Sequence, residues 1–244
     1  MTLAAETGRD QTRGSDCAAL TVPDGGGPRA SAEDTHALGV AAHDLGLDLP
    51  PATVGKLVEY LDLLERWNRV YNLTAVRDRQ AMRIQHLNDS LAITAALRRG
   101  VALPAPRILD VGSGAGLPGL VIALCWPEAS VTCVDAVGKK VAFMAQAAAT
   151  LGLDRVAALH ARVESMPVER PFDVVTARAF AGLADIVAAT ERLLASDGVW
   201  ALAKGRRPDI EIATVRGDVF HVEPLRVPEL DAERHLVWIR GYAR

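Results

Sequence analysis

Residues 107 to 119 constrain this chain more than any other stretch. They read Arg-Ile-Leu-Asp-Val-Gly-Ser-Gly-Ala-Gly-Leu-Pro-Gly, an apolar strand that runs directly into a glycine-rich loop. Glycine has no Cβ and tolerates positive φ, so such a loop lets backbone N–H groups come close to a ligand at the mouth of a parallel sheet. The segment predicts an α/β fold that binds a nucleoside cofactor.

The glycine spacing leaves two cofactors open. Gly114, Gly116 and Gly119 match the G-x-G-x-x-G string of dinucleotide-binding loops, which alone does not decide. Asp110 ends the strand, where its carboxylate can accept hydrogen bonds from the loop's amides or attract a cationic ligand. A diphosphate is disfavoured beside a carboxylate, whereas the sulfonium and ammonium groups of S-adenosylmethionine suit it. We therefore expect S-adenosylmethionine, with an NAD-linked oxidoreductase as the alternative.

Short apolar strands alternate with helical segments from residue 107 onward. We expect strands at 107–111, 130–135, 156–159, 172–176 and 199–204, and helices at 116–125, 139–151 and 183–194. This alternation predicts an α/β fold with a doubly wound, mostly parallel, Rossmann-like sheet. The segments 219–227 and 235–241 have no helix between them and predict a terminal antiparallel hairpin, which favours a class I S-adenosylmethionine-dependent methyltransferase.

The residues before the sheet divide into two parts. Residues 1–34 are rich in Gly, Pro, Ser and acidic groups without an apolar period, which predicts a disordered tail. Residues 35–100 have helical periodicity, with one helix after Pro50-Pro51 and a second from about residue 80 to 99. We expect an N-terminal helical cap over 35–100 and the Rossmann-like core over 101–244.

Charge is distributed unevenly along the chain. The tail carries three basic and six acidic side chains, which accounts for the formal net charge of −3. Residues 66–107 carry eight arginines against two aspartates, a local balance of +6. This basic flank suggests a polyanionic substrate such as RNA, and equally an ordinary solvated helix face in an arginine-rich protein.

Several classes of protein are disfavoured. No segment resembles a signal peptide or is long and apolar enough to span a bilayer, so we expect a cytoplasmic protein without membrane contact. Cys17, Cys125 and Cys133 have no metal spacing, and two of them fall in expected buried elements. The histidines show no zinc spacing either, so we predict no metal site.

Polar residues at the ends of the later strands are candidate ligands of the cofactor. Asp135 ends the second strand, where an acidic side chain reaches ribose hydroxyls in either cofactor interpretation. Val163 and Glu164 follow the third strand and could hold an adenine edge, although Glu164 alone is more typical of a helix start. Arg178 follows the fourth strand and could hold substrate or a cofactor carboxylate, or pair with Asp185 or Glu191.

The target of the reaction is constrained by what the loop after Arg178 lacks. It has neither an Asn or Asp before Pro-Pro, as in methyltransferases acting on amines, nor a nucleophilic cysteine. Methylation of an atom with an exposed lone pair, such as guanine N7, needs no general base. Alignment of that atom with the methyl carbon and the sulfur is then sufficient, so we assign no catalytic residue.

Three further residues are candidates for binding the substrate. Lys204 could meet RNA phosphate, Asn72 could orient a base or stabilise its own turn, and His86 could contact substrate or be a core histidine satisfied by Asp89.

The chain also resembles a known family in a series of ordered motifs. They are Arg66-Trp67-Asn68, Tyr71-Asn72-Leu73-Thr74, Val76-Arg77-Asp78, His86-Leu87-Asn88-Asp89-Ser90, the glycine loop with Leu117-Pro118-Gly119, Asp135 with Gly138-Lys139-Lys140, Arg162-Val163-Glu164, Ala177-Arg178-Ala179-Phe180, Leu202-Ala203-Lys204-Gly205 and Glu233-Arg234-His235-Leu236-Val237. Together they look like the bacterial ribosomal small-subunit methyltransferase G family, also called glucose-inhibited division protein B, over roughly residues 50 to 240.

The resemblance implies transfer of a methyl group from S-adenosylmethionine to N7 of one guanine in 16S rRNA, within the free RNA or the small ribosomal subunit. It places the cofactor against Gly112, Leu117, Val163, Glu164 and Arg178, and the spacing argument adds Asp135. We expect a monomer. Besides the NAD-linked oxidoreductase, a non-catalytic rRNA-binding assembly protein is the other alternative to this function. The family pattern does not include residues 1–34, so function should survive their removal.

Overall fold

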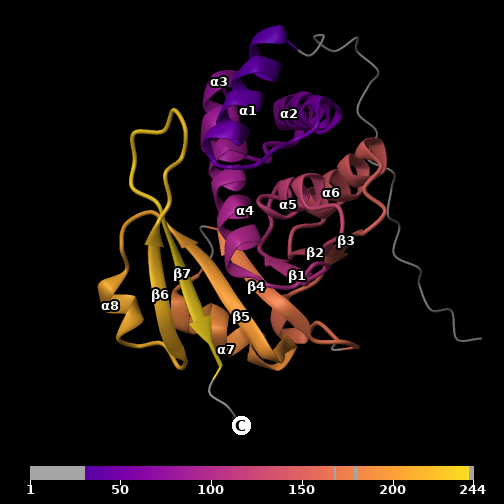
Figure 1. Ribbon diagram of the computed structural model, residues 1–244. Helices are drawn as coiled ribbons and strands as arrows, with labels where there is room; N and C mark the ends of the chain where they lie inside the picture. The colour runs from indigo at the N-terminus through magenta and orange to yellow at the C-terminus, as the bar shows by residue number, and fades with distance from the viewer. Residues whose placement is uncertain (1–30, 168, 179–180, 242–244) are drawn as a thin grey trace, which may run out of the picture.

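The computed structural model describes residues 31–167, 169–178 and 181–241, which form a seven-stranded sheet with helices around it (Figure 1). The strand order is β3-β2-β1-β4-β5-β7-β6. Strands β1 to β5 are parallel, and β7 runs antiparallel to both β5 and β6. The strands are β1 (Arg107–Val111), β2 (Ser130–Asp135), β3 (Val156–His160), β4 (Phe172–Arg178), β5 (Leu194–Lys204), β6 (Asp218–Pro224) and β7 (His235–Arg240). The doubly wound sheet and its terminal hairpin are therefore confirmed.

The five expected helices appear in order with different boundaries. The helices are α1 (Ala32–Asp44), α2 (Pro51–Tyr71), α3 (Arg79–Met82), α4 (Asp89–Gly100), α5 (Gly119–Cys125), α6 (Gly138–Leu151), α7 (Leu183–Thr190) and α8 (Asp209–Ile212). Of these, α1 and α8 were not expected as separate helices. Residues Arg83–Asn88 form a π-helical segment between α3 and α4, which we call the π turn. The single helix expected over 80–99 is thus continuous but locally widened, as often happens at functional sites.

Two other boundaries differ for local reasons. The helix expected from 116 begins only at Gly119, because residues 114–118 form a turn. The helix expected over 183–194 ends at Thr190, and a short 3-10 turn leads into a β5 strand that begins five residues before Val199. There, Trp200 is buried and its Nε1 donates to Thr190 Oγ1 at 2.8 Å, which fixes the junction.

Helix α1 begins inside the segment that we expected to be a tail. Ser31 caps it, accepting a hydrogen bond from Asp34 N at 3.0 Å, and Asp34 is buried. The prediction of disorder is therefore wrong for residues 32–34, whereas residues 1–30 lie outside the described residues. Removing the chain as far as Asp34 would cut into helix α1, so tolerance of truncation stays a prediction for residues 1–30 only.

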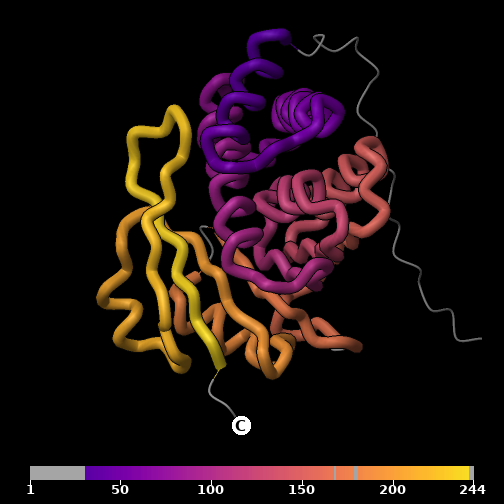
Figure 2. Tube along the Cα trace, in the orientation of Figure 1, coloured from indigo at the N-terminus to yellow at the C-terminus, as the bar shows by residue number. Residues whose placement is uncertain are grey.

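The helices before the sheet pack directly on the core. Helix α2 contacts α5 and α6, and α4 lies along α5 (Figure 2). One hydrophobic cluster contains Leu57 and Leu64 of α2 together with Leu120 of α5 and Phe143 of α6. Tyr60, fully buried in α2, donates from its hydroxyl to the Ala115 carbonyl of the glycine loop at 2.7 Å. The division into cap and core stays a prediction, because a continuous core joins the two segments.

In the described part of the chain, every helix is too short or too polar to cross a membrane.

The hydrogen bond from Tyr60 gives the first testable prediction. Tyr60→Phe should lower the free energy of unfolding by about 2 kcal/mol, because the Ala115 carbonyl loses its buried donor. Chemical denaturation measures the loss. Tyr71→Phe, also in α2 but only half-buried, is the matched control and should cost much less. Equal losses for both variants would contradict the prediction.

Candidate active site

The glycine loop at the end of β1 is held by the buried carboxylate of Asp110, the fourth residue of that strand. Asp110 is fully buried, and its Oδ2 accepts a hydrogen bond from Gly119 N at 2.9 Å. A Cβ on Gly119 would come within 2.8 Å of that oxygen and 2.4 Å of Cys133 Sγ, so this position requires glycine. Burial raises the pKa of Asp110 to about 6. Of the two roles left open for Asp110, holding the loop is the one observed.

The backbone amides of the loop are largely engaged within the protein. Gly112 N and Ser113 N both donate to the Val134 carbonyl, at 2.9 and 3.1 Å. Gly114 N donates to Asp135 Oδ2 at 2.9 Å. The expectation that these amides face a ligand is therefore wrong, and the loop cannot offer them to a diphosphate. The glycines instead allow an uncharged stretch of backbone to come close to a ligand.

One cavity lies on the β2 and β3 side of Gly112 and has a volume of about 370 Å³. It is lined by Gly112, Asp135, Val163 and Glu164, together with Lys140 and other residues of the same strand ends. Asp135 also accepts from Val137 N at 2.9 Å, so its carboxylate is fixed by two amides. The structure thus brings together the residues expected to hold the nucleoside.

A second cavity lies on the β4 and β5 side of Gly112, with a volume of about 490 Å³. We call it the target cleft. It is lined by Leu117 and Arg178, by Leu73, Thr74 and His86 of the helical segments, and by Lys204 of β5. Both cavities include Gly112, so a ligand placed across this residue reaches both.

Two arginines of the target cleft are organised around one buried carboxylate. Asp89 accepts from Arg178 Nη1 at 3.2 Å and from Arg234 Nε at 2.8 Å. Arg178 also donates to the Gln85 carbonyl at 2.9 Å. The sequence did not single out Arg234 as a site residue, although it stands in the Glu233-Arg234-His235 motif. Neither suggested partner of Arg178, Asp185 or Glu191, is the one observed.

His86 lies in the π turn and is nearly buried, with its Nε2 2.8 Å from Thr74 Oγ1. Burial, and then the positive charge of Arg178, lowers the pKa of His86 to about 4. The imidazole is therefore neutral at pH 7. Asp89 does not satisfy it, because that carboxylate is shared by two arginines. His86 lines the target cleft, as a residue that contacts substrate would.

Asn72 does not line the target cleft. It ends α2 in the left-handed conformation, with φ at 50°, and its Oδ1 accepts a hydrogen bond from Arg77 Nη2. Of its two open roles, stabilising the turn is the one observed. The loop that follows is ordered by the buried Asn68, whose Oδ1 accepts from Thr74 N at 2.8 Å. This bond holds Thr74 beside the cleft.

Lys204 lines the target cleft, but its ammonium group also has partners within the protein. Its Nζ donates to Glu211 Oε2 at 2.8 Å and to the Ala181 carbonyl at 3.1 Å. Its side chain is 18% exposed. Lys204 can therefore present charge to a ligand in the cleft only from a fixed position.

The basic flank of the sequence is mostly satisfied within the protein. Arg79 and Arg83 pair with carboxylates, Arg98 donates to the Cys125 carbonyl, and Arg107 donates to the Pro171 carbonyl. The arginines of this segment therefore make contacts within the protein more than they form an exposed basic surface. Positive charge reaches the target cleft through Arg178, Lys204 and Arg234 instead.

Cys125 and Cys133 are buried core residues, as expected, and Cys17 lies outside the described residues. Burial raises the pKa of the Cys125 thiol to about 12 and that of Cys133 well above its usual value. Neither thiol is therefore suited to act as a nucleophile.

Two solved structures that share this fold are methyltransferases. Magnesium protoporphyrin IX methyltransferase from Synechocystis PCC 6803, solved with bound S-adenosylmethionine, superposes with a TM-score of 0.54 at 17% identity, over 76% of this chain and 97% of that one. A S-adenosylmethionine-dependent methyltransferase from Aquifex aeolicus gives a TM-score of 0.52 at 14% identity, over 69% and 96%. The fold is that of the class I S-adenosylmethionine-dependent methyltransferases, which confirms the predicted class.

Sequence comparison identifies the family. The pattern that describes GidB, rRNA small subunit methyltransferase G, matches residues 53–237. A relative named ribosomal RNA small subunit methyltransferase G from Acidovorax sp. (strain JS42) is 53% identical over 218 residues, covering 85% of this chain and 96% of the relative. Another of that name, from Methylibium petroleiphilum, is 54% identical over 200 residues, covering 81% and 90%. The chain belongs to the rRNA small subunit methyltransferase G family, and the resemblance found in the sequence is confirmed.

The buried Asp110 makes stability depend on pH in a way that a variant can reveal. Its pKa is about 6 in the folded protein against 3.8 as the ordinary value, so the folded state binds the proton more tightly. The free energy of unfolding should therefore fall by about 3 kcal/mol in total as pH rises from about 3 to about 7, through both pKa values, with most of the loss between pH 4 and 6. Asp110→Asn should lack this slope, as measured by chemical denaturation at several pH values.

Asp48→Asn is the control for this experiment, because that aspartate is exposed and its removal should leave the slope intact. A slope between pH 4 and 6 that is the same in Asp110→Asn and in the unmodified protein would refute the assignment.

Proposed function

We propose that this protein transfers a methyl group from S-adenosylmethionine to N7 of a single guanine in 16S rRNA. The observation that carries the proposal is the pair of cavities that meet at Gly112. One presents nucleoside-binding groups, and the other presents three cations and one carboxylate. Family membership supports ribosomal RNA as the substrate. In this proposal the protein acts in the cytoplasm as a monomer.

The residues of the smaller cavity fit the adenosine part of the cofactor. Asp135 would accept from the ribose hydroxyls, Val163 would cover the adenine ring, and Glu164 would accept from its amine. Leu117 and Arg178 lie on the other side of Gly112, where Arg178 would hold the amino-acid carboxylate. The engaged amides of Gly112 and Gly114 disfavour a dinucleotide in the same place.

When bound, S-adenosylmethionine supplies an electrophilic methyl group. Guanine N7 has an exposed lone pair and no proton to lose, so the protein needs no general base. His86 is neutral at pH 7 and would contact the base as a hydrogen-bonding group. Lys204 and Arg234 would neutralise phosphates at the entrance, since phosphate contacts position a nucleic acid.

The proposed reaction predicts a defined chemical difference in the RNA. The 16S rRNA from cells that lack this gene should have one 7-methylguanosine fewer than RNA from cells that contain it. Mass spectrometry of nuclease digests measures the difference. Purified protein with S-adenosylmethionine should restore the modification. Unchanged 7-methylguanosine content would overturn the proposed function.

The two cavities predict that cofactor and RNA affinities can be separated by mutation. Glu164→Ala should weaken S-adenosylmethionine binding about tenfold, because a charge-assisted hydrogen bond is lost. Lys204→Ala should leave that affinity unchanged and raise the KM for RNA. Calorimetry and steady-state methylation measure the two quantities. Variants that weakened both ligands equally would show that the division between the cavities is wrong.

A further inference from the structure

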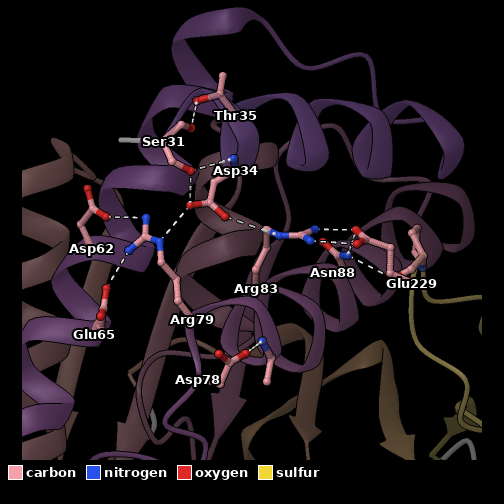
Figure 3. A network of polar contacts seen from close by, with 12 residues as sticks. Ser31, Asp34, Thr35, Asp62, Glu65, Asp78, Arg79, Arg83, Asn88 and Glu229 are labelled. Carbon is pink, nitrogen blue, oxygen red and sulfur yellow. Dashed lines mark hydrogen bonds and ion pairs between the residues drawn. The ribbon is translucent and has the colours of Figure 1, made fainter. Parts of the chain in front are cut away.

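A partly buried polar network joins helices α1, α2 and α3, the π turn, and the loop between β6 and β7 (Figure 3). That loop spans residues 225–234, and we call it the 225–234 loop. In Figure 1 it extends beyond the sheet toward α1 and α3. Its base is closed by Leu225 N, which donates to the Arg234 carbonyl at 2.7 Å. The network is therefore connected to a segment that ends in the target cleft.

Arg83 connects the network to this loop. Its side chain is only 5% exposed and lies between Asp34 of α1 and Glu229 of the loop. Both terminal nitrogens donate to the Glu229 carboxylate, and the Nη2 to Oε2 distance is 2.8 Å. Such a bidentate pair fixes orientation as well as distance. Arg83 therefore holds Glu229 in one place.

Asn88, at the other end of the π turn, holds the same part of the loop. It is fully buried, and its Nδ2 donates to the Pro228 carbonyl at 3.0 Å and to Glu229 Oε1 at 3.3 Å. Glu229 itself has a φ of 63°, in the left-handed region that L-residues other than glycine rarely adopt. Such conformations persist where the surroundings fix them, and they cluster at functional sites.

The end of the 225–234 loop is held by the residue that follows the π turn. Arg234 Nε donates to Asp89 Oδ1 at 2.8 Å, and the arginine side chain remains 27% exposed at the target cleft. The π turn and the first residue of α4 thus fix the loop at two points, Glu229 and Arg234.

We propose that Arg83 and Glu229 are positioning residues for RNA binding, because their ion pair holds the 225–234 loop so that Arg234 meets an RNA phosphate beside the target guanine. This proposal rests on the proposed function and extends it to a loop outside the glycine-rich site. Neither Arg83 nor Glu229 lines the target cleft, so they act on RNA through Arg234.

The same network contains a matched control. Asp62 Oδ1 lies 2.6 Å from Arg79 Nη2, within the network but away from the 225–234 loop. Asp62→Asn and Glu229→Gln each replace one network carboxylate by an amide. If the network only stabilises the fold, both variants lower the melting temperature and neither changes RNA binding specifically. A positioning role affects the KM for RNA in the Glu229 variant alone.

A second variant, Glu229→Gly, separates a structural role of Glu229 from a positioning role more clearly. Glycine tolerates the left-handed backbone, so this variant removes the carboxylate while relieving the conformational cost at φ 63°. A purely structural role predicts a lower melting temperature, partly offset by relief of that conformational cost, and no change in the KM for RNA. The positioning role predicts a larger rise in the KM for RNA than with Glu229→Gln, because glutamine still accepts hydrogen bonds from Arg83.

The experiment measures steady-state methylation of 16S rRNA and of 30S subunits, both prepared from cells that lack the gene. We expect the KM for RNA to rise about threefold in Glu229→Gln and about tenfold in Glu229→Gly. S-adenosylmethionine affinity by calorimetry and kcat at saturating RNA should be retained. Hydrogen exchange should increase in the 225–234 loop. Asp62→Asn should keep the KM of the unmodified protein.

A KM for RNA in Glu229→Gly equal to that of the unmodified protein, or an equal rise in Asp62→Asn, would overturn the positioning role and leave the proposed function standing. If the unmodified protein methylates neither RNA substrate, the proposed function fails and the positioning role fails with it.

Discussion

The site depends on two aspartates that fix the glycine loop from its two sides. Asp110 accepts from Gly119 N beneath the loop, and Asp135 accepts from Gly114 N beside it. Hydrogen bonds from backbone amides to buried carboxylates are among the stronger ones in proteins. Because Gly114 N and Gly119 N already donate to these carboxylates, they are not free to donate to a diphosphate. The same two side chains therefore fix the shape of the loop and disfavour a dinucleotide as its ligand.

The sequence predicted those features that depend on local periodicity and strand order. Short apolar strands alternating with helices fixed the sheet, and the carboxyl ends of neighbouring parallel strands brought Gly112, Asp135 and Glu164 to one cavity. The π turn and the early start of β5 were missed, because both arise from tertiary contacts. The hydrogen bond between Trp200 and Thr190, for example, has no signature in the pattern of either residue.

The charge pattern of the sequence was the poorest guide to where positive charge lies in the structure. A run of arginines does not show whether each guanidinium reaches solvent or a distant carboxylate, and Arg83 pairs with Glu229, which lies 146 residues further along the chain. Arg234 was missed for the converse reason, because one arginine between polar neighbours has no distinctive pattern. Only the fold brings it to Asp89, and so to the cleft.

The arrangement around Asp89 explains how a cleft can be both cationic and ordered. Two guanidinium groups share one buried carboxylate, which orients Arg178 and Arg234 and leaves an excess of positive charge. An unpaired arginine would be free to change its conformation, whereas the shared carboxylate holds both guanidinium groups in place. Because transfer to a lone pair depends on alignment rather than on proton removal, a target cleft with fixed cations is the feature that such a reaction most needs from the protein.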